Sequence, residues 1–404
     1  MQRGHLSDYF DGVVVKQLSV VETTPTASHQ HEFNGSIALR RLLGDDDRLN
    51  MPTRFIRIDD ETGAVSADGV ISWYDARRRH PTRTEYRLYY KGNEVTGTMQ
   101  PGDSFFLALD KQGRALIILT SEGSTTQNQL MWLFGLERKA HHSFTYQAIN
   151  PGQSAELNFI ARYILDELGI EASEPEAAVL DRLIAPFGLT FPRTREFSDL
   201  ARNSLPEVSA LDDPDMALVA WMDREEQLFR RLERRIVAAR IEAGFRDADG
   251  ADVDGFIAFS LSVQNRRKAR VGQALENHLE AVLLAHGIRY ARGAETENRN
   301  KPDFLFPGQA EYRDPAFPAD RLTMLGAKST VKDRWRQVLS EAARIEAKHL
   351  LTLEPGISEN QTDEMRAKSL QLVIPHSLHQ TYRPQQQPWL IDFRSFLNFL
   401  RSRQ

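Results

Sequence analysis

The fold is decided by residues 302–341, which read PDFLFPGQAEYRDPAFPADRLTMLGAKSTVKDRWRQVLSE. Two short apolar runs in this stretch, DFLF and LTMLGAK, are typical of β-strands, and the segment between them is rich in Pro and polar residues. Asp303 opens the first run and Lys328 ends the second, 25 residues later. This spacing predicts two neighbouring strands joined by a long turn, with the aspartate beside the lysine.

An aspartate and a lysine placed in this way suit the hydrolysis of a phosphodiester. The reaction needs charge neutralised on a phosphorane-like transition state and a water activated for attack. A metal ion held by carboxylates, with a lysine beside it, supplies both, and hard oxygen ligands select Mg²⁺. The acid that usually stands two residues before such a lysine is missing, because that position is Gly326. With Asp303 alone, the metal site would be one carboxylate short.

The segment after Lys328 offers a replacement for this acid. Its apolar spacing predicts an amphipathic helix over 333–348. Arg334 and Glu341 are seven residues apart and would share one face of that helix, so Glu341 could reach back toward the sheet. The helix start near Lys332 would offer free N–H groups to a phosphate. On spacing alone, an ordinary exposed helix acid remains the alternative for Glu341.

The surrounding sequence alternates helices and strands, which indicates a mixed α/β domain with a central sheet. Strands are expected at IRYARG, DFLFP, LTMLGAKST, LLTLE and LQLVIP, and further helices at 214–244, 271–286, 359–369 and 391–401. Glu276 flanks the apolar stripe of the helix at 271–286. As for Glu341, its spacing fits either a site residue or an ordinary exposed helix acid.

The N-terminal part follows a β pattern. Between residue 13 and about residue 135, six short β-branched or aromatic runs are separated by turn sequences: VVVKQLSVVE, TRFIRIDD, GVISWYDA, EYRLYY, SFFLALD and ALIILTS. They predict a small barrel or sandwich, interrupted by one helix at 36–43. We therefore expect a β domain at 1–150, a helical connector at 151–190 and the α/β domain at 191–404.

The composition of the 404 residues is that of an ordinary globular protein, with 41% hydrophobic and 26% charged residues. The chain has no cysteine, which excludes disulfides and thiolate metal sites and suits the cytoplasm. It shows neither a signal peptide nor a run of about 18 apolar residues, so we expect a cytoplasmic protein without a membrane span. The net charge of −5 still permits DNA binding, which depends on where the cations lie.

The cations are clustered. Three groups contain almost no acids: Arg77, Arg78, Arg79, Arg83 and Arg87; Arg266, Arg267, Lys268 and Arg270; Lys328, Lys332, Arg334 and Arg336. A solvated face is the alternative explanation for any one of them. Because there are three, and two flank the candidate site, they favour a polyanionic partner.

The sequence also resembles a known family. The stretches SVQNRRKARVGQALENHLEAVLLAHGIRYARG, NKPDFLFPG and LTMLGAKSTVKDRWRQVLSEA are similar to the catalytic domain of EcoRII-type restriction endonucleases. The similarity extends back to FPRTREF and on through HLLTLEPGIS and LQLVIPHSLHQTY, over about 210 residues. KPDFLFP, AKSTVKDRWRQ and SVQNRRKAR are its most specific motifs.

The resemblance implies a PD-(D/E)XK nuclease fold in which a helix glutamate replaces the missing strand carboxylate. It assigns Asp303 and Glu341 to a Mg²⁺ ion and makes Lys328 the catalytic lysine, assisted by Lys332. Two further positions match residues at or near the family's active centre, Tyr312 and Glu276.

The same resemblance implies contacts with DNA. The family recognises short sites flanked by CC and GG, which a forked guanidinium can read through the two acceptors of guanine. This assigns DNA contacts to Arg266, Arg267, Arg334 and Arg336. A phosphate contact or a plain surface charge is the alternative for each.

The N-terminal part resembles the family more loosely. SHQHEFNG followed by a helix, and strands containing WYDARRR and YRLYY, are similar to a pseudobarrel effector domain related to plant transcription-factor DNA-binding domains. In the family this domain binds a further copy of the recognition site and restrains the nuclease. The resemblance places Arg77, Arg78 and Arg79 at that DNA.

The sequence therefore predicts a Mg²⁺-dependent type II restriction endonuclease that cuts double-stranded DNA. A two-fold enzyme matches a two-fold site, so a homodimer is expected, with a companion DNA methyltransferase to protect host DNA. Two alternatives remain. One is a nicking or mismatch-repair nuclease, and the other is a DNA-binding regulator with an inactive nuclease domain.

Overall fold

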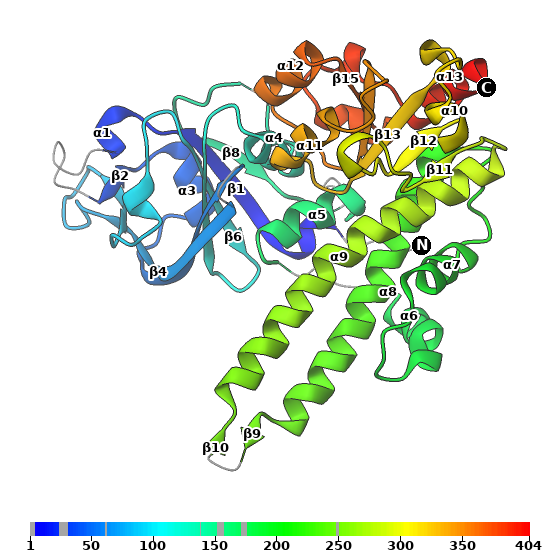
Figure 1. Ribbon diagram of the computed structural model, residues 1–404. Helices are drawn as coiled ribbons and strands as arrows, with labels where there is room; N and C mark the ends of the chain where they lie inside the picture. Colours follow the sequence, from blue (N-terminus) through cyan, green and yellow to red (C-terminus); the bar gives the residue numbers. More distant parts are fainter. Residues whose placement is uncertain are drawn as a thin grey trace. The chain divides into compact units, whose positions relative to one another are not determined.

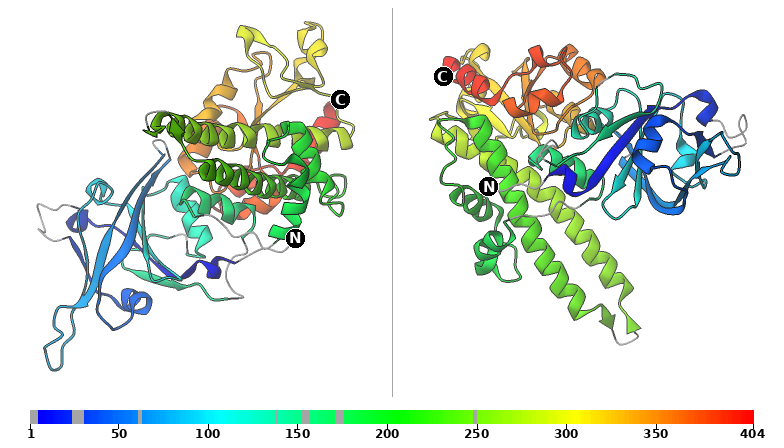
Figure 2. Two further views of the ribbon diagram at one scale, coloured as in Figure 1. Left: turned by 90° about the horizontal axis from the view of Figure 1, so that it is seen from below. Right: turned by 180° about the vertical axis from the view of Figure 1, so that it is seen from behind.

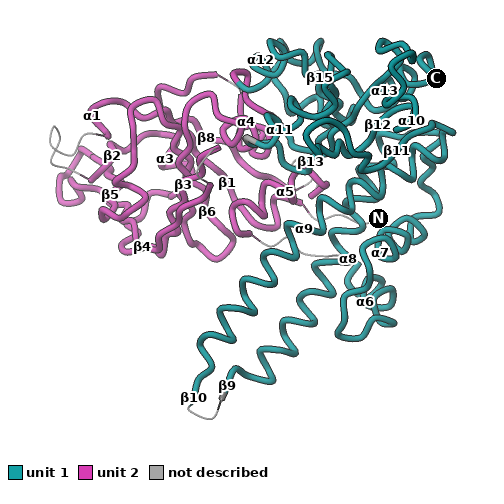
Figure 3. The backbone as a smooth tube through the Cα atoms, in the orientation of Figure 1, with its two compact units in different colours: residues 1–2, 174–355, 361–404 teal, residues 3–173, 356–360 magenta. Residues whose placement is uncertain are grey.

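The computed structural model describes residues 5–23, 31–60, 63–137, 139–151, 157–170, 176–247 and 250–404. The chain divides into two compact units, shown in different colours in Figure 3. The N-terminal unit consists of residues 3–173 and 356–360. The other unit, named the catalytic unit after the predicted nuclease domain, consists of residues 1–2, 174–355 and 361–404. Each unit has its own main sheet.

The N-terminal unit is built on an eight-stranded sheet with the order β2-β5-β4-β3-β7-β6-β1-β8 (Figure 1). The strands are β1 (Phe10–Gln17), β2 (Glu32–Asn34), β3 (Arg48–Asp59), β4 (Gly63–Asp75), β5 (Tyr86–Tyr90), β6 (Ser104–Asp110), β7 (Ala115–Thr120) and β8 (Thr145–Ala148). All paired neighbours are antiparallel except β3 and β7. The predicted mainly β domain is confirmed, whereas the short strands β2 and β8 were not predicted.

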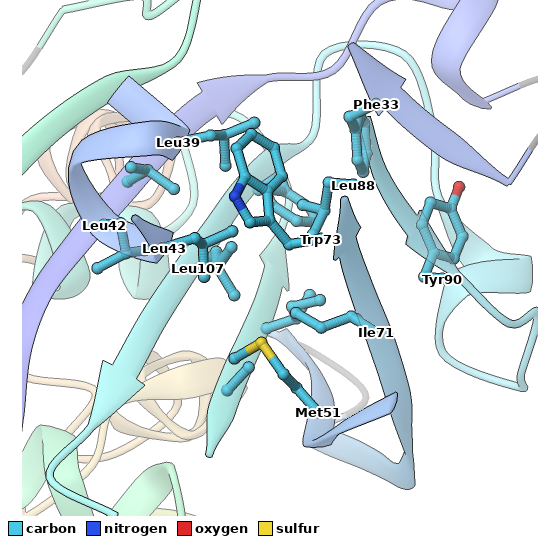
Figure 4. Packing of buried hydrophobic residues seen from close by; sticks show 14 of the residues in the cluster. Phe33, Leu39, Leu42, Leu43, Met51, Ile71, Trp73, Leu88, Tyr90 and Leu107 are labelled. Carbon is cyan, nitrogen blue, oxygen red and sulfur yellow. The ribbon is translucent and has the colours of Figure 1, made fainter. Parts of the chain in front are cut away.

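A hydrophobic core holds this sheet to helix α3 (Ile37–Leu43). Figure 4 shows Leu39 and Leu43 of the helix beside the ring of Trp73 on β4. The helix begins where the sequence predicted, because Ser36 caps it by accepting a hydrogen bond from the Leu39 N–H at 3.1 Å. The unit's other helical segments are η1 (Leu6–Asp8), α1 (Val20–Thr23), η2 (Thr96–Thr98), α4 (Thr125–Leu133) and α5 (Phe159–Glu167).

The catalytic unit contains the mixed sheet that the sequence predicted. Its order is β11-β12-β13-β14-β15. The strands are β11 (Ala291–Arg292), β12 (Phe304–Phe306), β13 (Thr323–Lys328), β14 (Lys348–Thr352) and β15 (Leu370–Val373). The first three strands are antiparallel to their neighbours, whereas β13, β14 and β15 run parallel.

Helices surround this sheet. They are α6 (Ala177–Ile184), α7 (Thr194–Asn203), α8 (Pro214–Ala243), α9 (Val253–Ala285), α10 (Gln309–Arg313), α11 (Trp335–Leu339), α12 (Glu359–Ala367) and α13 (Phe393–Arg403). Short 3-10 segments are η3 (Ala185–Phe187), η4 (Glu297–Arg299), η5 (Ala319–Arg321), η6 (Lys332–Arg334), η7 (His376–Thr381) and η8 (Gln387–Trp389). Over the described ranges, no helix has the length and apolar character needed to cross a membrane.

Helices α8 and α9 form a long hairpin that extends beyond the sheet of the catalytic unit (Figures 1 and 2). Its tip is the small strand pair β9 (Arg246–Asp247) and β10 (Gly250–Ala251). The expected start of α9 at residue 271 is wrong, since the helix begins at Val253 after the cap residue Asp252. The apolar run FIAFSLSV in its first half is exposed to a large extent, so it lacks the amphipathic spacing that marks a helix in sequence.

The expected helix over 333–348 is also wrong. Only η6 and α11 are helical there, and the chain then turns directly into β14. Trp335, Val338 and Ala342 are all buried, and their spacing imitates the buried face of a helix. However, Ala342 has a φ of 50° and is not helical. A non-glycine residue in this left-handed region ends a right-handed helix.

Candidate active site

Strands β12 and β13 bring Asp303 beside Lys328, as the spacing predicted. In their antiparallel register Phe304 lies opposite Leu325, so Asp303 faces the end of β13. Its Oδ2 accepts hydrogen bonds from Lys328 Nζ at 2.9 Å and from the Ala327 N–H at 2.7 Å. Both charged side chains are less than one fifth exposed, at 17% and 18%, so their interaction is partly shielded from water.

Gly326 leaves no room for a carboxylate on the strand. A Cβ at this position would lie 2.9 Å from Val338 Cγ2 and 3.5 Å from Leu350 Cδ1. Val338 is fully buried on α11. Because interiors are close-packed, α11 occupies the volume that a second strand acid would need.

Glu341 reaches this site from the turn after α11 and not from a helical face. Burial raises the pKa of Glu341 to about 7, and the nearby Asp303 carboxylate adds to the rise, whereas Lys328 and Lys348 oppose it. Its Oε2 atom is buried, and in the described part of the chain it has no hydrogen-bond partner. A shielded carboxylate oxygen without a donor, close to a second carboxylate, is a position that a bound cation would satisfy.

Tyr312 and Glu297 hold the turn that carries Glu341. The Tyr312 hydroxyl donates to Glu297 Oε2 at 2.6 Å and accepts from the Arg344 N–H at 3.3 Å. Glu297 also accepts from the Ala343 N–H at 3.1 Å. Burial raises the pKa of Tyr312 to about 12, and Glu297 contributes to the shift. Tyr312 therefore contacts the backbone of the turn, and sequence reasoning missed its partner Glu297.

The same turn is fixed on its other side. The Asn300 side chain donates from Nδ2 to the Ser340 carbonyl at 2.8 Å, and Thr296 Oγ1 accepts from the Ala342 N–H at 3.4 Å. These contacts stabilise the positive φ of Ala342. The segment 296–300 thus sets the path of the chain immediately before and after Glu341.

Glu276 on α9 lies close enough to Asp303 for the two carboxylates to interact electrostatically. Burial raises the pKa of Glu276, and the Asp303 carboxylate adds to the rise. Arg292 opposes the shift, because its Nη2 and Nε donate to Glu276 Oε2 at 2.9 and 3.2 Å. Arg292 also binds Glu280 at 3.0 Å, so it fixes one face of α9 to the sheet edge. Nothing in the sequence pattern marked Arg292 beyond its place in the expected strand IRYARG.

The other candidate residues after β13 lie at the surface. Lys332 is exposed on η6 and has a φ of 34°, in the left-handed region. Arg334 donates from Nη2 to the Thr330 carbonyl at 2.8 Å. Arg336 forms an exposed ion pair with Glu364 at 2.9 Å. All three side chains are exposed, so the cations are accessible from solvent.

The predicted DNA-binding arginines of the two other clusters are partly engaged within the chain. The guanidinium of Arg266 lies 4.6 Å from the ring centre of Phe191, and Arg267 pairs with the buried Glu233 at 2.6 Å. In the N-terminal unit Arg77 pairs with Glu85 and Arg78 pairs with Asp47. Arg79, the next residue in the connection from β4 to β5, is exposed.

The carboxylates of this site fit a hard divalent cation. Over the described ranges, no group of three or more histidine or acidic side chains is arranged to enclose a metal by itself. Mg²⁺ does not require such a cage, because it is usually bound through one or two carboxylates together with waters and substrate phosphates. Asp303 and Glu341 match that smaller number of carboxylates.

Comparisons with known proteins identify relatives of this chain. Residues 229–397 match the family model described as EcoRII C terminal. The type II restriction enzyme EcoRII of Escherichia coli is 32% identical over 381 residues, which cover 92% of this chain and 84% of that protein. The type II restriction enzyme SsoII of Shigella sonnei is 27% identical over 201 residues, which cover 44% of this chain and 64% of that protein.

Two solved structures are also similar. One is metal-depleted Ecl18kI in complex with uncleaved, modified DNA, with a TM-score of 0.42 and 17% identity over 56% of this chain and 83% of that chain. The other is a complex of the restriction endonuclease PspGI with substrate DNA, with a TM-score of 0.44 and 15% identity over 53% of this chain and 93% of that chain.

The chain is a type II restriction endonuclease, that is, an enzyme that cleaves DNA at specific sites. Identity of 32% over most of both proteins identifies it more closely. It belongs to the EcoRII family, with the catalytic domain that the sequence predicted.

Proposed function

We propose that this enzyme cuts both strands of duplex DNA at a short site containing CC and GG, in a Mg²⁺-dependent reaction. The observation that carries the proposal is the convergence of Asp303, Lys328 and Glu341. The first two are joined by a hydrogen bond of 2.9 Å, and the third presents a buried oxygen without a donor.

In this proposal Asp303 and Glu341 hold the Mg²⁺ ion. When bound, the ion neutralises charge on the scissile phosphate and lowers the pKa of the attacking water. Lys328 directs its ammonium group at the charge that develops on the phosphate oxygens. Lys332, exposed on η6, assists by contacting a phosphate of the approaching DNA.

Glu276 and Tyr312 support these groups without binding the ion themselves. Glu276 adds a third negative charge near Asp303, and Arg292 keeps this carboxylate in place. Tyr312 keeps the turn of Glu341 in place through Glu297. Both are positioning residues in our scheme, because each acts through the groups that hold the ion.

We further propose that the enzyme is a homodimer that works on cytoplasmic DNA, since a two-fold protein matches a two-fold site. The accessible cations after β13, Arg334 and Arg336, would contact the site that is cut. The N-terminal unit would bind a further DNA copy through the segment of Arg77, Arg78 and Arg79. A companion methyltransferase would protect the host's own sites.

Incubation of the protein with supercoiled plasmid and Mg²⁺ tests the proposal. Discrete double-strand fragments, absent when EDTA replaces Mg²⁺, are the expected result. Nicked circles alone would favour a nicking enzyme, and intact plasmid with retained DNA binding would favour a regulator. Sequencing the fragment ends then gives the site, and ends that share no CC or GG would refute the proposed specificity.

A further inference from the structure

The loop between β13 and η6 joins Lys328 to the cations that the proposed function places at DNA. It consists of residues 329–331 and is followed by Lys332 and Arg334 on η6. A shift of this loop would move Lys328 relative to the side chains that contact DNA. Because small misplacements of reacting groups have large effects on rate, the path of the loop matters for cleavage.

Glu354 holds this loop from the neighbouring strand. Its Oε2 atom accepts a hydrogen bond from the Val331 N–H, and both residues are buried, with Glu354 only 4% exposed. Strands β13 and β14 are parallel, and their last pair is Lys328 with Thr352. Glu354 lies two residues beyond this pair and Val331 three, so the contact joins the two segments after the sheet has ended. A charged acceptor makes such a bond stronger than one between neutral groups.

The backbone of Glu354 is itself held in place through both of its polar groups. Its N–H donates to Thr352 Oγ1 at 3.1 Å, and its carbonyl accepts from the Tyr382 hydroxyl at 2.7 Å. Thr352 and Tyr382 are both fully buried. Glu354 therefore presents its carboxylate from an ordered part of the catalytic unit, as a side chain that positions another segment must.

Val331 is also the residue from which η6 starts. Its carbonyl accepts a hydrogen bond from the Arg334 N–H at 2.8 Å, which closes the first turn of that segment. The next residue, Lys332, has a φ of 34°, and a non-glycine residue keeps such a conformation only where its surroundings impose it. The bonds to Glu354 and Arg334 restrain both polar groups of Val331 and thereby the start of this strained turn.

We infer that Glu354 is a positioning residue that aligns the catalytic lysine with the side chains that contact DNA. The inference rests on the proposed function, because that function places Lys332 and Arg334 at DNA. Glu354 acts through the loop, since its Oε2 atom is bound to the Val331 N–H. Loss of Glu354 should therefore disturb the alignment of DNA while the Mg²⁺ requirement stays the same.

Two substitutions separate the hydrogen bond of Glu354 from its charge. Glu354→Ala should slow single-turnover cleavage at least about 30-fold, because the loop loses its support. The Kd for site DNA should rise about 10-fold, and discrimination against a site with one changed base pair should fall about 10-fold. Glu354→Gln keeps an oxygen that can accept the Val331 N–H, so all three quantities should stay within about fivefold of those of the unaltered protein. In both variants the Mg²⁺ concentration for half-maximal rate should change less than about twofold, because Asp303 and Glu341 remain.

Asp392→Ala is the matched control, because Asp392 is a carboxylate of the same unit that accepts a backbone N–H, from Ser395 at 2.6 Å at the start of α13. This variant should lower the free energy of unfolding without changing the discrimination between DNA sites. Tyr382→Phe disturbs Glu354 more mildly, since it removes only the hydroxyl that donates to the Glu354 carbonyl. It should lower cleavage and discrimination by about threefold, and it tests the inference even if Glu354→Ala does not fold.

Hydrogen exchange followed by mass spectrometry examines the loop without DNA or metal. Residues 329–334 should exchange at least about tenfold faster in Glu354→Ala than in the unaltered protein, because the Val331 N–H loses its acceptor. Equal exchange, unchanged discrimination between sites, or a glutamine variant as impaired as the alanine variant would overturn the inference. Plasmid that stays intact with the unaltered protein in Mg²⁺ would instead refute the proposed function. An enzyme that cuts plasmid but shows equal exchange in both proteins would refute only the role of Glu354.

Discussion

Lys328 donates a hydrogen bond from Nζ to the Oδ2 atom of Asp303 at 2.9 Å. We expect Lys328→Ala to slow cleavage by at least about 100-fold, since one charge-stabilising donor in a shielded site contributes that much to a rate. Specific DNA binding should change only a few-fold, because the ammonium acts on the transition state. Single-turnover cleavage and gel shifts measure the two effects. Cleavage within tenfold of the unaltered rate would exclude Lys328 from the mechanism.

Glu341 is expected to be as important as Asp303. Glu341→Ala should abolish Mg²⁺-dependent cleavage as completely as Asp303→Ala, whereas Glu346→Ala, an exposed acid five residues later, should have no effect. Moving the acid to the strand, as Gly326→Glu combined with Glu341→Ala, should restore nothing and should lower stability. The reason is the approach of 2.9 Å between a Cβ at position 326 and Val338. Restored cleavage in this double variant would contradict our account of the glycine.

The stability of the metal-free protein should depend on pH through Glu341. Burial raises the pKa of Glu341 to about 7, so the folded state holds this proton more tightly than the unfolded state does. The proton on Glu341 therefore stabilises the folded state fully below the ordinary glutamate pKa. This stabilisation is lost as the pH rises through about 7. In EDTA at pH 8, Glu341→Gln should therefore be more stable than the unaltered protein, by about 1–2 kcal/mol after discounting for partial exposure.

Urea unfolding at pH 8 and pH 5 measures this difference. At pH 5 both proteins carry an uncharged group at position 341, and the free energies of unfolding should agree within about 0.5 kcal/mol. A stabilised Glu341→Gln at both pH values would point to a packing effect. A destabilised variant at pH 8 would show that the carboxylate has a partner in the metal-free protein.

The turn between α11 and β14 is the element that delivers Glu341. Tyr312→Phe removes the hydrogen bonds of the tyrosine hydroxyl to Glu297 and to the Arg344 N–H. We expect a cleavage rate reduced about 10-fold and a higher Mg²⁺ requirement, because the turn loosens while both metal-binding carboxylates remain. A titration of rate against Mg²⁺ measures both quantities. A loss as large as that of Glu341→Ala would instead make the hydroxyl a catalytic group.

The same turn shows how far the sequence could predict the site. The strands of Asp303 and Lys328 were predicted because an acid and a lysine bracket two clear apolar runs. Glu341 was selected as a candidate on the expectation of a helical face, which the structure does not have, because buried Trp335, Val338 and Ala342 imitate the spacing of a helix. The true path depends on a hydrogen bond that the Asn300 side chain donates and on one that the Tyr312 hydroxyl accepts, and both residues are more than 25 positions away. Such long-range contacts leave no local pattern in a single sequence.

The first half of α9 was missed for a related reason. Sequence patterns reveal a helix when one face is apolar and the other polar. Phe256, Ile257 and Leu261 are exposed together, so this segment has no such contrast within one chain. The short strands β2 and β8 were missed because three or four residues form a strand only beside a partner.

The division of the molecule into two units gives a prediction about fragments. Helix α6 belongs to the catalytic unit, and its Leu180 and Ile184 are fully buried against Phe197 and Leu228. A fragment of residues 174–404 should therefore fold and cut DNA in Mg²⁺. The shorter fragment 191–404, which begins at the boundary expected from sequence, lacks α6 and should be less stable by about 3–6 kcal/mol.

Urea unfolding of the two fragments measures this difference, and equal stability would show that α6 contributes nothing to the catalytic unit. Cleavage of DNA with a single site is the second readout. If the N-terminal unit restrains the nuclease, the 174–404 fragment should cut this substrate at least as fast as the whole protein. A folded fragment without activity would show that the N-terminal unit is needed to complete the active site.

Helix α9 carries the exposed Leu261 and the candidate site residue Glu276 on one uninterrupted rod of 33 residues. The angular phase between these two positions is fixed by the helix, at about 100° per residue. One inserted residue between them would turn Leu261 by about 100° relative to Glu276 and shift it by about 1.5 Å along the helix axis. Only certain insertions or deletions in this segment therefore preserve the relative orientation of the two side chains. Seven residues, about two full turns, restore the phase, and intermediate lengths do not.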